Sequence, residues 1–99
     1  MRTEEDRKLI LSGVNALIGE ITPPLRSVSI EVSNKTIRWK CVFDSDATED
    51  DFELLSAAAT EVIADFPKEY GLEEIIVVVP SPQQTEPLKN VIYHRHENN

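Results

Sequence analysis

Residues 26–43 read RSVSIEVSNKTIRWKCVF, and this stretch predicts a β-hairpin whose turn lies at Asn34 and Lys35. If Ser33 lies opposite Thr36, one face of the hairpin becomes apolar and the other becomes polar. The apolar pairs are then Val28 with Cys41, Ile30 with Trp39 and Val32 with Ile37, and the polar pairs are Ser29 with Lys40 and Glu31 with Arg38. A shift of one residue would destroy this separation, so the pattern fixes the register. Asn tolerates the positive φ that a two-residue turn requires.

The segment before the hairpin predicts an amphipathic helix. It begins after Thr3, a suitable N-cap, and is expected to continue until Pro23 and Pro24 end it. Its apolar stripe consists of Leu9, Ile10, Val14, Leu17, Ile18 and Ile21. Gly13 lies inside this helix and indicates either close packing against a neighbour or a locally weak helix.

A second amphipathic helix is predicted after the hairpin, from Glu49 to Phe66. Thr48 precedes it, and Asp51 stands three residues further on, which is the spacing of a capping box. Pro67 follows directly and favours a helix end at the preceding residue. The residues that recur at helical spacing on its apolar face are Leu55, Ala59, Val62, Ile63 and Phe66.

Two more strands complete the chain. Residues 75–79 are continuously apolar and β-branched, which is typical of a central strand. Residues 91–96 predict the last strand, and the proline-rich residues 80–87 predict an exposed loop between the two. The expected fold is α+β, in the order α-β-β-α-β-β, with a four-stranded, mainly antiparallel sheet and both helices on one face. We expect one domain over residues 1–99, with a partly apolar patch on the other face formed by Ile76, Val78 and Ile92.

The charge of the chain is unevenly distributed. The net charge is −8, and residues 44–74 hold eleven acidic residues but only one base, Lys68. Nucleic acid and anionic membranes are therefore excluded as partners of this segment, because their phosphates would be repelled. A basic protein is the natural complement of such a surface.

The acidic residues are densest in residues 44–53, which read DSDATEDDFE and contain six carboxylates. Two interpretations apply. Glu49, Asp50 and Asp51 belong to the first turn of a helix, where the helix dipole favours negative charge, so they have a structural cause. Asp44 and Asp46 precede the cap, Glu53 extends the exposed flank, and no neighbouring base neutralises them in the sequence. This second group favours a docking surface.

No catalytic or metal-binding motif is complete. Residues 44–55 begin like a calcium loop, but Glu49 stands where that loop needs Gly and Leu55 where it needs Glu. His94 and His96 point to one side of a strand without a third ligand, and Cys41 lies on the apolar face of the hairpin as a buried thiol. We therefore expect a binding protein that is not an enzyme and uses no cofactor or metal.

The charged N-terminal residues lack the apolar core of a signal peptide, and no apolar run is long enough to span a membrane. These observations predict a cytoplasmic protein.

Several stretches together resemble small bacterial immunity proteins, the antidotes encoded beside toxins of contact-dependent growth inhibition and other polymorphic toxins. The resemblance rests on the acid-led helix with residues 48–56 and 60–66, the strand that ends at Val79, and the C-terminal segment 91–97. It implies a cytosolic, non-catalytic bacterial antitoxin that binds one cognate toxin domain, often a nuclease, and blocks its active site or substrate groove. The expected complex is 1:1 and formed by a monomer.

The residues that would bind the toxin are predicted from the charge pattern and from the need for an apolar or aromatic anchor. They are Asp44, Asp46, Glu49, Asp50, Asp51, Glu53, Tyr70 and Tyr93, with the Ile76 and Val78 face as another candidate anchor. Two other functions remain open at this point. One is an acidic secretion chaperone or adaptor that binds an effector protein, usually as a dimer. The other is an enzyme that uses His94, His96 and a carboxylate.

Overall fold

The hairpin has the predicted register in the computed structural model of the protein, which describes residues 1–97. Strands β1 (Leu25–Ser33) and β2 (Thr36–Phe43) pair antiparallel, and every predicted residue pair is present. Asn34 and Lys35 have φ angles of 51° and 59°. Both residues of the turn therefore adopt the left-handed conformation that a two-residue hairpin loop with this twist requires.

The hairpin forms the centre of a mixed sheet with the strand order β3-β2-β1-β4. Strand β4 (Asn90–His94) pairs antiparallel with β1, whereas β3 (Gly71–Val78) pairs parallel with β2. The prediction of a mainly antiparallel sheet is confirmed, with one parallel pair. The prediction that residues 75–79 form a central strand is wrong, because β3 lies at the edge. The last strand also ends earlier than predicted.

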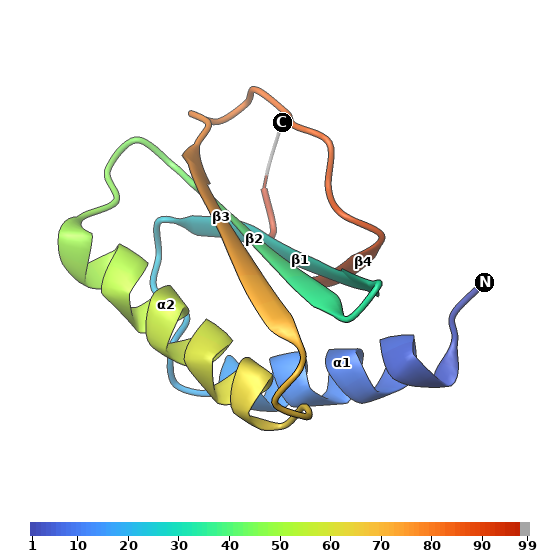
Figure 1. Ribbon diagram of the computed structural model, residues 1–99. Coiled ribbons are helices and arrows are strands. Elements are labelled where there is room, and N and C mark those ends of the chain that lie inside the picture. Colours follow the sequence, from blue (N-terminus) through green and yellow to red (C-terminus); the bar gives the residue numbers. More distant parts are fainter. Residues whose placement is uncertain (98–99) are drawn as a thin grey trace.

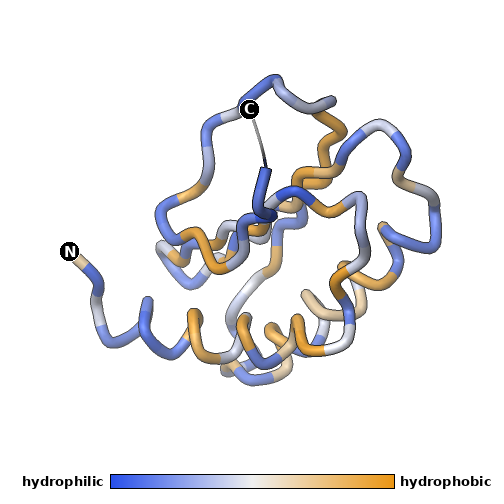
Figure 2. Tube along the Cα trace, turned by 180° about the vertical axis from the view of Figure 1, so that it is seen from behind, coloured by the Kyte–Doolittle hydropathy of each residue, from blue (hydrophilic) through white to orange (hydrophobic). Residues whose placement is uncertain are grey.

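Both helices cover one face of this sheet, as predicted (Figure 1). Helix α1 (Glu4–Ala16) packs against β1 and β4, and helix α2 (Glu49–Ala64) packs against β2 and β3. The apolar face of the hairpin is buried beneath them, fully except at Val32, which is half-buried. Figure 2 shows the hydrophobic segments of the strands and helices along the chain. The largest side chains that form this core are Leu9, Leu25, Ile30, Ile37, Trp39, Phe43 and Leu55. Burial of this one face is the main stabilising contribution.

Helix α1 is shorter than predicted. It ends at Ala16, and the chain turns through residues 17–20, where Gly19 has a φ of 81°. The predicted apolar stripe is therefore divided. Leu9 and Leu17 are buried, but Ile18 is 75% exposed, and Val14 and Ile21 are also exposed.

Gly13 lies at a close contact between α1 and the sheet. A Cβ atom there would stand 2.9 Å from Ile92 Cδ1 and 3.3 Å from Ile30 Cδ1. Of the two explanations for this glycine, close packing is the correct one. Because residue 13 has no side chain, the backbone of α1 can pack closely against β1 and β4.

The polar face of the hairpin is crossed by the exposed segment 79–89, in agreement with the predicted loop. Lys40 Nζ donates to the carbonyl of Glu86 at 2.5 Å, and Ser29 Oγ accepts a hydrogen bond from the backbone of Leu88 at 2.9 Å. The apolar patch predicted on this face is not present. Ile76 and Ile92 pack instead against the core on the helix side, at opposite edges of the sheet.

Candidate functional site

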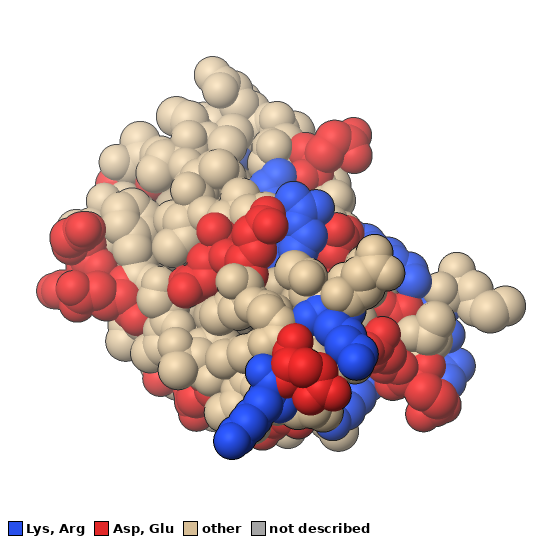
Figure 3. Space-filling view, viewed as in Figure 1, with Lys and Arg blue, Asp and Glu red and all other residues tan. Residues whose placement is uncertain are grey.

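The start of α2 presents four exposed carboxylates, those of Asp46, Glu49, Asp50 and Glu53, which we call the acidic surface. The red atoms at the left of Figure 3 mark the acidic residues at this end of α2. None of the four lies within 4 Å of a lysine or arginine nitrogen among the described residues. Their charge is therefore not neutralised within the part of the chain that the structure describes.

Asp51 has a structural role beside this surface. Its carboxylate accepts hydrogen bonds from the backbone N–H of Thr48 at 2.8 Å and from the Thr22 hydroxyl at 2.7 Å. These bonds, the one from the Thr48 backbone first, lower the pKa of Asp51. Asp51 thus caps α2 and joins it to the turn before β1, as the predicted capping box suggested.

Asp44 is neutralised, contrary to the sequence argument that no base lies near it. Arg95 Nη2 donates to Asp44 Oδ2 at 2.8 Å, and the backbone N–H groups of Ser45 and Ser81 donate to Oδ1. The bond from Arg95 is the largest cause, and together these bonds lower the pKa of Asp44 to about 2. Arg95 lies 51 residues away in the chain, so no local pattern in the sequence places it beside Asp44.

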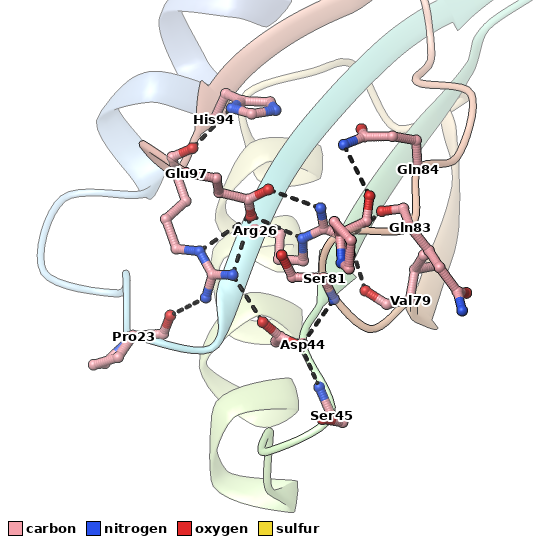
Figure 4. A network of polar contacts seen from close by, with 12 residues as sticks. Pro23, Arg26, Asp44, Ser45, Val79, Ser81, Gln83, Gln84, His94 and Glu97 are labelled. Atoms are coloured by element: carbon pink, nitrogen blue, oxygen red, sulfur yellow. Dashed lines mark hydrogen bonds and ion pairs between the residues drawn. The ribbon is translucent and has the colours of Figure 1, made fainter. Parts of the chain in front are cut away.

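Asp44 belongs to a network in which two arginines hold the C-terminal segment against the start of β1 (Figure 4). Arg26 is 4% exposed and binds both oxygens of Glu97, with Nε and Nη2 each at 2.8 Å. Its Nη1 donates to the carbonyl oxygens of Val79 and Gln83. Hydrogen bonds from Arg26 are the largest cause that lowers the pKa of Glu97 to about 2. No local pattern in the sequence indicates this network, which joins four distant segments: the start of β1, the residue after β2, residues 79–83 and residues 95–97.

The two tyrosines predicted as anchors lie away from the acidic surface. Tyr70 follows the C-terminal end of α2, packs on Phe66 with ring centroids 5.2 Å apart, and donates a hydrogen bond to Glu5. Tyr93 lies on β4, at the opposite edge of the sheet from α2. It contributes to an apolar groove beside α1 that is lined by Val14, Leu17, Ile18, Ile21 and Ile92.

One flank of α2 faces the edge of β3. Ser56 Oγ donates to Glu74 Oε1 at 2.7 Å and so places this flank beside the strand. Glu49 and Glu53 precede Ser56 by seven and three residues, and this spacing puts them on the same flank of a helix. Glu74 lies beside this flank and was not among the predicted site residues, although it belongs to the acidic segment 44–74.

Other chemistry has little support in the described chain. Among residues 1–97, no three His, Cys, Asp or Glu side chains are grouped so that they could hold a metal ion. Cys41 is fully buried, and this burial raises the pKa of its thiol to about 12. No helix in the described part of the chain is sufficiently long and apolar to cross a membrane.

Two comparisons with known proteins bear on function. A family model described as MafI2 immunity protein matches residues 6–97, which is nearly the whole chain. This match confirms the resemblance to small bacterial toxin-immunity proteins. A comparison with curated proteins found no match.

Proposed function

The chain belongs to the MafI2 immunity protein family, and from this premise we propose that it neutralises its cognate toxin by placing the acidic surface in a basic substrate groove of the toxin. The toxin domain is proposed to be a nuclease. Such a domain must attract the phosphates of RNA or DNA with lysine and arginine side chains. Carboxylates at the start of α2 would then stand in for phosphates and exclude the substrate.

One observation supports this function above the others: Asp46, Glu49, Asp50 and Glu53 are exposed and have no cationic partner within the described residues. Other carboxylates of the chain, such as Asp6, Asp44 and Glu97, are paired with lysine or arginine. Clustered like charges repel one another and oppose folding. A basic partner would relieve this repulsion and would be attracted from a distance, which accelerates association.

Charge alone does not produce the affinity that neutralisation needs. A Kd of about 1 nM corresponds to roughly −12 kcal/mol, and interfaces of that strength bury apolar or aromatic anchors. Tyr70 already contacts Phe66 and Glu5 within the chain. Tyr93 lies at the edge of the sheet opposite to β3. Strand β3 borders the acidic flank of α2 and carries a run of partly exposed apolar residues, so the anchor is proposed on that side.

The test is a triple charge reversal, Asp46→Lys, Asp50→Lys and Glu53→Lys. The matched control reverses three exposed acids elsewhere, Glu4→Lys, Glu61→Lys and Glu86→Lys, and changes the net charge equally. Both variants are mixed with the toxin domain encoded in the adjacent reading frame, and association is followed by stopped-flow fluorescence. We expect the first variant to associate about tenfold more slowly than the control. Equal rates for the two variants would refute the acidic surface as the toxin-binding site.

A further inference from the structure

Strand β3 has a free edge over its whole length. It pairs with β2 on one side, and no strand lies beyond it among the described residues (Figure 1). The pairing covers eight residues, Gly71–Val78, and continues without a register shift. Its outer edge therefore offers a straight row of backbone groups to another strand.

The direction of these backbone groups follows from two hydrogen bonds. The N–H of Gly71 donates to the carbonyl of Lys35, and the N–H of Val79 donates to that of Phe43, so odd-numbered residues face β2. Backbone groups alternate in direction along a strand. The N–H and C=O groups that point outwards are therefore those of Leu72, Glu74, Ile76 and Val78, and they have no strand partner within residues 1–97.

β3 has few of the features by which natural edge strands avoid pairing, and its charged residues are the two acidic ones, Glu73 and Glu74. Such strands are usually short, interrupted by a bulge, or equipped with Pro or Lys. The other edge strand, β4, has five residues and a register shift in its pairing with β1. β3 has eight residues, contains neither Pro nor Lys, and carries the continuous apolar run that predicted a central strand. Its composition fits a strand that has neighbours on both sides.

The charge beside this edge indicates which neighbour fits. Glu49 and Glu53 lie on the flank of α2 that borders β3, and Glu74 lies on β3 itself. Lys68 is the one base in residues 44–74. If a second copy of this chain paired with the edge, the acidic flanks of the two copies would face each other, and their like charges would repel. A strand that carries lysine or arginine would instead gain opposite-charge contacts there.

We propose that an extended strand of the cognate toxin pairs with the free edge of β3 and continues the sheet. This inference rests on the proposed toxin-binding function and specifies how the complex is built. Side chains of the toxin strand on the helix side would be basic and would lie beside Glu49, Glu53 and Glu74. Those on the other side would be apolar and would lie beside Ile75 and Val77, which are half-buried. The backbone hydrogen bonds and these apolar contacts supply the anchor that charge does not.

The first experiment removes one outward N–H group with Glu74→Pro. Proline is tolerated on an edge strand where the N–H faces solvent, so the pairing with β2 is kept. The matched control, Glu74→Thr, loses the same carboxylate but retains the N–H group. We expect the toxin domain from the adjacent reading frame to bind the proline variant about tenfold or more weakly than the threonine variant, measured by calorimetry. Thermal unfolding checks that both variants are folded. Equal affinities in folded variants would overturn the proposal.

The second experiment needs no variant. Backbone amide exchange is measured by NMR for the free chain and for its complex with the same toxin domain. We expect Leu72, Glu74, Ile76 and Val78 to exchange rapidly in the free chain and to become protected in the complex, while the odd-numbered residues of β3 are protected in both. A complex in which these four amides still exchange rapidly overturns the strand pairing but leaves the proposed function intact. Absence of any complex refutes the proposed function itself. Protection that appears in the free chain as its concentration rises would assign the edge to a second copy and overturn the toxin strand as its occupant.

Discussion

Glu97 and Asp44 are bound by the same guanidinium, that of Arg95, and Glu97 is also bound by Arg26. The pKa of each carboxyl is lowered to about 2, because hydrogen bonds from arginine favour the charged form. In an unfolded chain these groups titrate at about 4. A carboxyl whose pKa is lower in the folded state stabilises the fold above its unfolded pKa. This contribution is lost as the pH falls through the folded value.

We therefore expect the midpoint of thermal unfolding to be nearly constant around neutral pH and to fall between about pH 4 and about pH 2. Glu97→Gln weakens the contact with Arg26, so it should lower the midpoint at neutral pH and make the acid dependence shallower. Glu86→Gln is the control, because this exposed carboxylate has no hydrogen bond among the described residues. Circular dichroism over this pH range measures both effects. An acid dependence in Glu97→Gln as steep as in the unchanged chain would contradict the assignment.

For single residues, the sequence predicts those contacts that form between residues close together in the chain. Thr48 and Asp51 are three residues apart, and their contact at the start of α2 could be foreseen from spacing. Asp44 and Arg95 meet only because the ends of two strands come together, and no spacing rule connects residues 51 positions apart. The same is true of Arg26 and Glu97. Whether a carboxylate is paired therefore has to be learned from the fold.

The turn between β1 and β2 is the clearest element for a test. Asn34 and Lys35 both adopt positive φ, and a residue with a side chain pays about 1–2 kcal/mol in that conformation. Lys35→Gly removes the cost at the second position, so we expect the free energy of unfolding to rise by up to about 1 kcal/mol. Urea unfolding measures the change. Lys35→Ala is the control, since it loses the same exposed contact with Glu69 but keeps a Cβ atom. If the two variants were equally stable, the gain in stability could not come from relief of the strained positive φ at position 35.

Strand β3 shows where prediction at the level of elements fails. The run Ile75–Val79 indicates a strand with two partly covered faces, and this much is correct, because Ile76 packs on the core and Ile75 and Val77 are half-buried on the other side. The number of neighbouring strands is a different property, and it depends on where α2 leads the chain. The crossover through α2 places β3 parallel to β2 at the rim of the sheet. The hairpin, by contrast, could be predicted pair by pair, because its register depends on local alternation.

The molecule as a whole has a charge of −8, and residues 44–74 carry the excess of acid. Long-range attraction to a basic toxin would act mainly on the rate of association, and dissolved salt screens it. We expect the association rate with the toxin domain to fall about tenfold as the salt concentration rises from about 0.05 M to about 0.5 M, with a much smaller change in the dissociation rate. Stopped-flow measurements at several salt concentrations give both rates. An association rate that does not depend on salt would show that charge does not guide the encounter.

Cys41 offers a practical way to observe this fold open. It is the single cysteine of the chain, and it lies on β2, between the sheet and the helix layer, where burial raises its pKa to about 12. A thiol reagent attacks the thiolate, so reaction requires the helices to separate from the sheet. The rate at which Cys41 is labelled in the native state therefore measures how often the core opens. A cysteine introduced on the surface would react much faster, so a fluorescent dye can be attached there while Cys41 remains unmodified.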